Sequence, residues 1–392
     1  MSNTENLSFL TRAIHTGNGI DSETGVIQRP IVLGNSYQLP YDPTDVNWSS
    51  TGGNLYTRNG GANQRYLEEK IASLEGGEDA VVLASGVAAL SGLFFALLKT
   101  GDHVVFSSVT YIASYRLLNE LFNNKFGIET TIVDTSDIKN VEAAIKPNTK
   151  LIHIETPGNP TLSISDIAAI AEIAHKNNAL LSVDNTFASP FNQRPIELGA
   201  DFSIESLTKY INGHGDAMGG SITGKKEYLN IVRAQSQVNL GGTISPFNAW
   251  LIARGAVTLP LRMKQHNENG LKIAQWLKEQ PEVSFVAYPG LEDSPNHEIA
   301  KKQMSGFGGV LSFGLKADHD THNQFVSHLK LITSAVSLGH DESLIVFLGE
   351  DDERQYLYPE QFHNGFFRLA LGIEDTQDLI NDLKQAFDKI RK

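Results

Sequence analysis

Short apolar segments alternate with helix-like segments along the middle of this chain, and this alternation limits the folds that it can adopt. Apolar runs of strand length occur at 80–84, 104–106, 130–133, 151–155 and 179–183. Segments with helical periodicity separate or flank them, at 67–74, 87–98, 112–123, 141–145 and 167–175. Short apolar strands alternating with helices indicate a mostly parallel sheet that is covered on both faces. We therefore predict an α/β fold for this part of the chain.

The two ends of the chain differ from the middle in their composition and periodicity. The first sixty residues are rich in Gly, Asn, Ser, Thr and Pro and show little periodicity, which often marks a partner-contacting segment. From about residue 251, helical stretches such as 271–279 and 322–329 alternate with strands such as 310–314. We predict an N-terminal arm (1–60) that contacts a neighbouring subunit, a large domain (61–255) and a smaller C-terminal α+β domain (256–392).

Composition excludes several classes of protein. With 41% apolar and 20% charged residues, the 392-residue chain is typical of a soluble globular protein. Its formal charge of −13 disfavours nucleic acid and anionic membranes as partners. No cysteine is present, so thiolate catalysis is excluded, and a cytoplasmic location is expected. No signal peptide is visible at the N-terminus, and the apolar run 93–98 is too short to span a bilayer.

A lysine between hydroxyl side chains points to the chemistry. Lys209 lies in the run Ser206-Leu207-Thr208-Lys209, after a strand-like segment and before a glycine-rich loop. Its amine could form a Schiff base with pyridoxal 5′-phosphate (PLP), and the hydroxyls could reach the phosphate. Asp184 ends an apolar run, where an ionised carboxylate needs a cationic partner such as a protonated pyridine nitrogen.

Each of these signals also has an ordinary interpretation. A lysine in such a run is usually a solvated surface residue, and an aspartate at a strand end is usually a turn residue. A third signal favours the cofactor: Ala84-Ser85-Gly86 follows a strand and opens a helix, whose free N–H groups can bind a phosphate. The G-x-G-x-x-G pattern of a dinucleotide site is absent after this strand.

Eight ordered blocks together carry a resemblance to a known family. The chain resembles the PLP-dependent transsulfuration (Cys/Met metabolism) enzymes, which include methionine and cystathionine γ-lyases and cystathionine γ-synthases. The resemblance covers nearly the whole chain. The blocks are Tyr56-Thr57-Arg58, Leu74-Glu75-Gly76-Gly77, Ala84-Ser85-Gly86, Glu155-Thr156-Pro157-Gly158-Asn159-Pro160, Val183-Asp184-Asn185-Thr186-Phe187, Ser206-Leu207-Thr208-Lys209-Tyr210, Ala335-Val336-Ser337-Leu338-Gly339, and Arg368 near Gly372-Ile373-Glu374-Asp375.

This resemblance implies PLP fold type I, which is aspartate aminotransferase-like, and assigns roles around the cofactor. Lys209 would hold PLP and move protons, and Asp184 would pair with the pyridinium nitrogen. The phosphate ligands would be the backbone amides of Gly86 and Val87, the hydroxyls of Ser206 and Thr208, and Tyr56 and Arg58 of a neighbouring subunit. The expected assembly is a homotetramer of two active dimers. No metal is expected.

The resemblance also assigns the substrate side of the site. Tyr111 would stack on the cofactor ring and is a candidate acid for the leaving group. Arg368 would bind the substrate carboxylate through a bidentate contact. Asn159 would lie near the ring oxygen, and Ser337 and Val336 would complete the substrate site.

The chain departs from the family pattern where the substrate is selected. Ala113 occupies the position of a cysteine in methionine lyases, and Val336 the position of a glutamate in relatives that process cystathionine. The acidic run Glu350-Asp351-Asp352-Glu353 replaces a family segment. Such a run is usually a solvated loop. Our sharper hypothesis is that one of these carboxylates faces the mouth of the site and selects a substrate with a cationic end, such as cystathionine or canavanine.

We predict a PLP-dependent lyase that catalyses γ-elimination from a γ-substituted amino acid of the methionine or cystathionine type, or from an analogue such as canavanine. The main alternative is γ-replacement, as in a cystathionine γ-synthase or an O-acylhomoserine sulfhydrylase. A β-lyase is a further alternative, and a transaminase fits the fold alone. From another class, the chain could be a catalytically retired PLP-binding protein.

Overall fold

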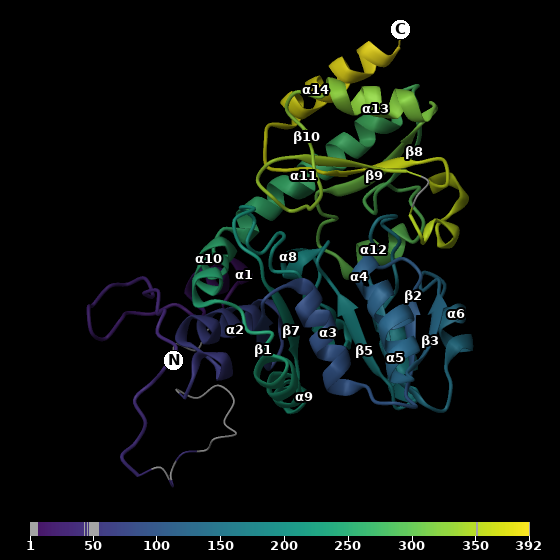
Figure 1. Cartoon of the computed structure of the whole chain (residues 1–392). Coiled ribbons are helices and arrows are strands. Elements are labelled where there is room, and N and C mark those ends of the chain that lie inside the picture. The colour runs from purple at the N-terminus through teal and green to yellow at the C-terminus, as the bar shows by residue number, and fades with distance from the viewer. Residues whose placement is uncertain (1–6, 43, 45, 47–54, 350–351, 392) are drawn as a thin grey trace.

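The computed structural model describes residues 7–42, 44, 46, 55–349 and 352–391. The larger part of the molecule is a seven-stranded sheet between layers of helices (Figure 1). The strand order is β1-β7-β6-β5-β4-β2-β3. These strands are β1 (Asp79–Leu83), β2 (His103–Ser107), β3 (Glu129–Val133), β4 (Thr149–Glu155), β5 (Leu180–Asp184), β6 (Phe202–Glu205) and β7 (Gly220–Gly224).

The strand directions confirm the mostly parallel sheet. Neighbouring strands run parallel except at β7, which is antiparallel to both β1 and β6. Every residue of β2, β6 and β7 is buried. Burial on both faces explains why strands such as β1 and β2 appear in the sequence as continuous apolar runs instead of alternating ones.

Helices cover both faces of this sheet. The helices of the large domain are α2 (Ala62–Glu75), α3 (Gly86–Leu97), α4 (Ile112–Tyr115), the π-helix η3 (Arg116–Phe122), α5 (Asn123–Phe126), α6 (Ile138–Ala144), α7 (Ile167–Lys176), α8 (Ser189–Asn192), α9 (Lys226–Val232), the π-helix η5 (Arg233–Asn239) and α10 (Pro246–Ala256), with short 3₁₀ turns η2 (Thr57–Asn59) and η4 (Pro195–Leu198). Val104 and Phe106 of β2 pack with α3 and η3, whereas Val105 packs with α6 and α7. Since alternate strand residues point to opposite faces, the two helix groups cover opposite sides.

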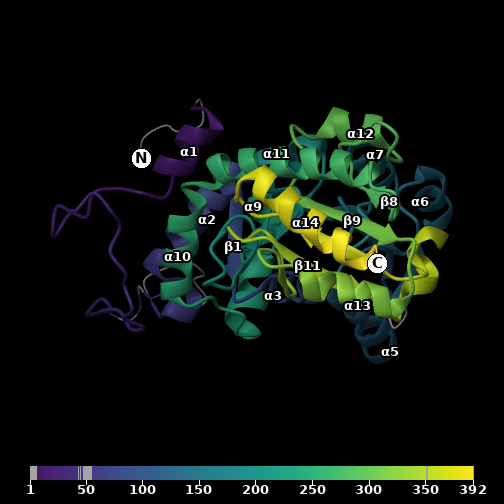
Figure 2. The same ribbon diagram turned by 90° about the horizontal axis from the view of Figure 1, so that it is seen from above.

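A second, smaller sheet domain follows in the chain. Its strand order is β10-β11-β12-β9-β8, and α11, α13 and α14 pack on it around Phe313, Phe325 and Phe387 (Figures 1 and 2). Its elements are α11 (Leu259–Lys278), β8 (Val283–Ala287), α12 (His297–Gln303), β9 (Val310–Leu315), α13 (His319–His328), β10 (Thr333–Ser334), β11 (Leu344–Leu348), η6 (Gln355–Leu357), η7 (Glu360–Phe362), β12 (Phe366–Ala370) and α14 (Thr376–Ile390). The boundary that we propose at 255/256 falls at the end of α10.

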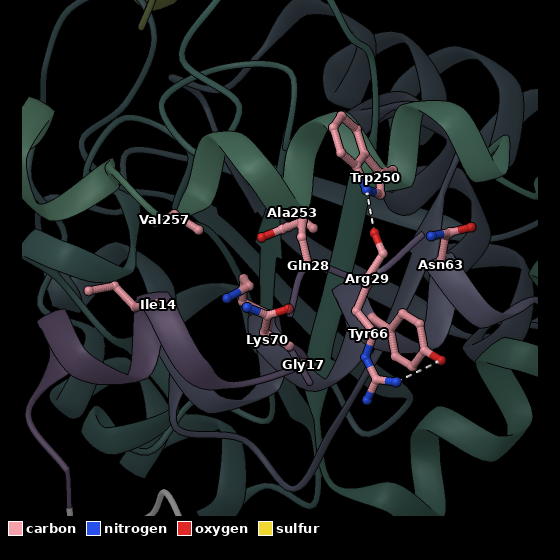
Figure 3. A pocket seen from close by; sticks show the side chains of 11 residues that line it. Ile14, Gly17, Gln28, Arg29, Asn63, Tyr66, Lys70, Trp250, Ala253 and Val257 are labelled. Carbon is pink, nitrogen blue, oxygen red and sulfur yellow. Dashed lines mark hydrogen bonds between the residues drawn. The ribbon is translucent and has the colours of Figure 1, made fainter. Parts of the chain in front are cut away.

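The N-terminal arm is less irregular than its composition indicates. It contains α1 (Phe9–His15), which is capped by Ser8, whose hydroxyl accepts from the Thr11 amide. Part of the following segment extends away from the body of the molecule (Figure 2). Gln28 and Arg29 of this segment return to line a pocket with residues of α2 and α10 (Figure 3). Trp250 Nε1 donates to the carbonyl of Arg29 at 2.9 Å, and the Arg29 guanidinium lies 4.1 Å from the Tyr66 ring centroid (Figure 3).

Two helices differ from the sequence expectation. The helix expected over 112–123 continues to Phe126 and changes to π geometry within η3. The helix expected over 271–279 is the C-terminal part of α11, which begins at Leu259. Its polar N-terminal half concealed the start, because Arg262 and His266 are buried there. Among the described residues, no helix combines the length and the apolar character needed to cross a membrane.

Candidate active site

A cavity of about 1100 Å³ lies between the C-terminal ends of the parallel strands and the second sheet. Its walls come from segments far apart in the sequence: the start of α3, the ends of β4 and β5, the lysine loop after β6, and strands β11 and β12. Open α/β sheets commonly bind ligands at this edge. Of the sequence-predicted site residues, eleven line it: Gly86, Val87, Tyr111, Asn159, Asp184, Ser206, Thr208, Lys209, Val336, Ser337 and Arg368.

Asp184 is a buried carboxylate without a cationic partner among the described residues. Both hydrogen bonds that it accepts come from Thr186, from the amide at 3.1 Å and the hydroxyl at 2.6 Å, and both use Oδ1. Burial raises the pKa of Asp184, although the Thr186 hydrogen bonds oppose this effect. A carboxylate in this position is completed by a protonated pyridine nitrogen.

Lys209 has its amine inside the cavity. Its Nζ donates to Ser337 Oγ at 2.7 Å, and Ser337 Oγ lies 3.2 Å from His340 Nε2. Burial, and then the charge of Arg368, lower the pKa of Lys209 to about 8. A neutral amine is therefore accessible near neutral pH, as both covalent attachment to an aldehyde and proton transfer require.

The start of α3 forms a cradle for an anion. Ser85 caps the helix by accepting from the Ala88 amide at 3.1 Å, which leaves the Gly86 and Val87 amides at the exposed first turn. A Cβ on Gly86 would lie 2.9 Å from the Ser206 Cβ, so a larger residue would close the cradle. Thr208 Oγ1 donates to the Gly219 carbonyl and accepts from the Gly219 amide, both at 3.2 Å, and Ser206 and Thr208 line the same cavity.

Arg368 projects from β12 into the same cavity. Its Nη1 donates to Asn159 Oδ1 at 3.0 Å and its Nη2 to the Ser337 carbonyl at 3.1 Å. Its Nε is buried without a hydrogen-bond partner among the described residues. Burial lowers the pKa of Arg368. A buried guanidinium with a free donor and no carboxylate partner is suited to bind an anion that comes with the ligand.

Glu155 belongs to the site, although sequence reasoning gave it no role. It ends β4 in register with Asp184 of β5. Its carboxylate accepts from the Tyr111 amide at 2.5 Å and from the Asn159 amide at 2.8 Å, and so it positions both residues. Burial, and then the charge of Asp184, raise the pKa of Glu155 to about 8. Its place at a strand end, like that of Asp184, was the signal in the sequence.

His340 is a second residue that sequence reasoning missed. It lies three residues after Ser337 and contacts the same hydroxyl that accepts from Lys209. Burial, and then the charge of Lys209, lower the pKa of His340. Single histidines in a sequence carry no positional information, so only the fold reveals this contact.

Tyr56 and Arg58 do not line the cavity. Both are exposed, and the Arg58 guanidinium lies 5.4 Å from the Tyr56 ring centroid. Tyr56 pairs with Ser36 in an isolated bridge of the arm. Their predicted role in a neighbouring subunit's site remains a prediction.

Two residues of the acidic run line the cavity, and each is paired with an arginine. Asp352 accepts a hydrogen bond from Arg354 Nη2 at 2.9 Å, and Glu353 accepts one from Arg116 Nε at 2.9 Å. Glu350 and Asp351 lie outside the described residues. Val336 is largely exposed at the cavity wall, with 77% of its surface accessible.

The donors and acceptors present fit PLP. Asp184 supplies the acceptor for a ring nitrogen, the α3 cradle supplies donors for a phosphate, and Lys209 supplies the amine. The orphaned Arg368 Nε leaves a separate donor for a substrate carboxylate.

Comparisons with known proteins agree with this fit. The sequence profile of the Cys/Met metabolism PLP-dependent enzymes matches residues 10–388. A canavanine γ-lyase of Rhizobium leguminosarum bv. trifolii is 52% identical, over 98% of this chain and 97% of that protein. A canavanine γ-lyase of Pseudomonas canavaninivorans is 50% identical, over 100% and 98%. The crystal structure of metB from Corynebacterium glutamicum superposes with a TM-score of 0.92 at 40% identity, and covers 99% of this chain and 100% of that one.

These matches confirm the predicted fold type, the PLP cofactor and a lyase of the transsulfuration group. Because the profile spans nearly the whole chain and two relatives share half of its residues, this chain belongs to the Cys/Met metabolism family of PLP-dependent enzymes.

Proposed function

We propose that this enzyme is a canavanine γ-lyase, which cleaves the Cγ–O bond of canavanine and releases hydroxyguanidine. The observation that carries the proposal is the identity of 52% and 50%, over nearly the full length, to two proteins of that name. Two features of the site support it. Ala113, which follows the cavity-lining Ile112, occupies the position at which methionine lyases carry a cysteine. Carboxylates also line the cavity that would receive a cationic side chain.

Substrate binding depends on Arg368. Its Nε and the adjacent Nη form a planar pair of donors, which matches the two oxygens of an α-carboxylate. Asn159 and the Ser337 carbonyl hold the guanidinium from the other side, at 3.0 and 3.1 Å. The amino acid is thereby oriented with its α-carbon toward Lys209.

Proton transfer depends on Lys209 and Tyr111. Bound PLP supplies an electron sink for the pair left at Cα when its proton is removed. Lys209 Nζ would take the proton from Cα and return it to the conjugated system of the bound ligand. Neutral again, it would take a proton from Cβ, so that the Cγ–O bond can break. Tyr111, held by Glu155 through its backbone amide, donates a proton to the departing oxygen. Ser337 keeps the Lys209 amine oriented between these steps.

Cofactor binding depends on the strand ends and on α3. Asp184 keeps a ring nitrogen protonated, and Thr186 keeps the Asp184 carboxylate in place through two hydrogen bonds. The Gly86 and Val87 amides and the Ser206 and Thr208 hydroxyls bind the phosphate.

We further propose that Tyr56 and Arg58 reach the phosphate in a neighbouring subunit of a homotetramer built from active dimers. Their exposure, their absence from the residues that line the cavity of their own chain, and the arm that extends from the body support this arrangement (Figure 2). Size-exclusion chromatography with light scattering of the wild type and the Arg58→Ala variant, together with PLP content, tests it.

The decisive experiment compares canavanine, methionine, cystathionine and O-acetylhomoserine at equal concentration. Hydroxyguanidine release is measured for canavanine, and leaving-group and 2-oxo acid release for the others, with the four-carbon product followed by NMR. We expect the highest kcat/KM for canavanine. A higher kcat/KM for methionine or cystathionine, or no hydroxyguanidine, would overturn the proposal.

The same panel with added thiol tests the γ-replacement alternative. After loss of the γ-substituent, a thiol can capture Cγ and give a thioether amino acid. Conversion wholly to such a product in the presence of thiol would make the enzyme a synthase.

A further inference from the structure

The cavity has an inner end and an outer rim that differ in chemistry. At the inner end, the buried Arg368 with its orphaned Nε marks the place of a ligand anion. At the rim lie Glu353 and Arg116, whose side chains are 41% and 58% exposed. A substrate whose carboxylate is bound by Arg368 would extend its far end toward this rim.

The two rim carboxylates are not equivalent. Asp352 already accepts from Arg354 Nε at 3.1 Å, from Arg354 Nη2 at 2.9 Å and from the Tyr358 hydroxyl at 2.9 Å. Burial would raise the pKa of Asp352, but these hydrogen bonds outweigh it and lower the pKa. The hydrogen-bond acceptors of Asp352 are therefore occupied, and this carboxylate holds Arg354 in place in the cavity wall.

The Glu353 carboxylate can accept further hydrogen bonds. Its contact among the described residues is with Arg116 Nε, which donates to Oε1 at 2.9 Å. Its Oε2 accepts no hydrogen bond from any described residue. A carboxylate can accept two parallel N–H donors from a guanidinium, and here it receives one.

The Arg116 side chain resembles the cationic end of a substrate such as canavanine. Its guanidinium offers the same planar array of donors as the guanidinooxy group of canavanine. Because exposed ion pairs contribute little, exchange of one guanidinium for another costs little. Arg116 also begins the π-helix η3, a geometry that is frequent at functional sites.

We infer that Glu353 recognises the guanidinium end of the substrate and that Arg116 holds this carboxylate in position until the substrate arrives. The inference rests on the proposed function for its substrate, and it adds the residue that selects a cationic distal group. Glu353 is thus a specificity determinant, apart from the groups that act on Cα and Cγ.

Arginine and citrulline test this inference without turnover. Arginine has a methylene where canavanine has oxygen, so its Cγ bond is not cleaved, and citrulline is its neutral near-isostere. Dissociation constants of both come from the change in visible absorbance of bound PLP. We expect the wild type to bind arginine more tightly than citrulline. Glu353→Gln should weaken arginine binding about 10-fold or more and leave citrulline unchanged, because a charge-assisted hydrogen bond is lost.

Two further variants serve as controls. Glu360→Gln removes an exposed carboxylate that does not line the cavity, and it should leave both constants unchanged. Arg116→Gln removes the competing guanidinium and should leave arginine binding as tight or tighter. The inference is overturned if the wild type does not prefer arginine, or if Glu353→Gln weakens both ligands equally.

The substrate panel separates this outcome from the proposed function. If the wild type does not turn over canavanine, the proposed function is contradicted. If the wild type turns over canavanine but Glu353→Gln still prefers arginine to citrulline as strongly as the wild type does, only the role of Glu353 is contradicted.

Discussion

The Lys209 amine is tied to Ser337, with Nζ donating to Oγ at 2.7 Å across 128 residues of sequence. Lys209 follows β6 of the large sheet, whereas Ser337 lies between β10 and β11 of the second. Ser337 adopts a φ of 96°, a conformation that non-glycine residues rarely hold. The two sheets therefore meet at the reactive amine, and the strained residue supplies the contact.

Replacement of Ser337 by alanine should slow proton transfer more than it weakens substrate binding. The Lys209 amine would lose its orienting acceptor, and a hydrogen bond to a charged or ionisable group contributes about 1.5–3 kcal/mol. We expect kcat to fall about 10-fold or more with a smaller change in KM. Exchange of the substrate Cα proton with deuterated solvent, followed by NMR, should slow in parallel.

The exposed Ser334 provides the control for this variant. Ser334 lies three residues before Ser337, on β10. Its replacement by alanine should leave both kcat and the rate of Cα proton exchange unchanged. Normal Cα exchange in Ser337→Ala would show that the contact has no part in proton transfer.

The lowered pKa of Lys209 predicts how the apoenzyme captures PLP. Burial and the charge of Arg368 lower this pKa to about 8, so the neutral amine that attacks the aldehyde becomes abundant as the pH rises through that value. The rate of PLP capture, measured by absorbance in a stopped-flow instrument, should therefore rise with pH and level off above about pH 8. A rate that still rises steeply near pH 10 would contradict the buried, cation-facing amine.

Arg368→Lys tests the bidentate contact with the substrate carboxylate. Lysine keeps the charge but loses the planar donor pair, as well as the hydrogen bonds to Asn159 and the Ser337 carbonyl. We expect KM to rise about 10-fold to 100-fold, on the scale of a lost charge-assisted hydrogen bond. PLP content should stay at the wild-type level, since the phosphate and ring ligands lie elsewhere. A variant that lost PLP while its KM stayed constant would place Arg368 in the cofactor site instead.

Particular residues show what the sequence could and could not predict. The parallel sheet was predictable because β1, β2, β4 and β5 are almost wholly buried and appear as apolar runs. The antiparallel β7 was not predicted, because Gly-Ser-Ile-Thr-Gly carries no such signal. Lys209, Asp184 and Gly86 were predictable because each sits beside a strand end within a short motif. Glu155 and His340 were not assigned, since their contacts join segments that only the fold brings together.

The acidic run illustrates the same limit. Its sequence predicts a solvated loop and allows a carboxylate at the cavity, but it does not say which one is free. Arg354 donates hydrogen bonds to Asp352 and so leaves it little capacity for a ligand. Arg116, more than two hundred residues from Glu353 in the sequence, donates to one oxygen of Glu353 and leaves the other available.

Glu155 makes the stability of the apoenzyme depend on pH. Burial and the neighbouring Asp184 raise its pKa to about 8, above the value of 4.5 for an ordinary glutamate. Between about pH 4.5 and 8 the folded state binds this proton more tightly than the unfolded state does, so the free energy of unfolding decreases as the pH rises through this window. Asp184, whose pKa is also raised, acts in the same direction.

Glu155→Gln should flatten this dependence, because glutamine stays neutral. Urea unfolding of the apoenzyme at pH 5 and pH 8, followed by circular dichroism, measures the decrease in stability for each protein. We expect a smaller decrease in the variant than in the wild type, even though glutamine offers only one acceptor to the Tyr111 and Asn159 amides and lowers stability at pH 5. Equal decreases would mean that Glu155 remains ionised beside Asp184, and that a cation outside this pair stabilises both carboxylates.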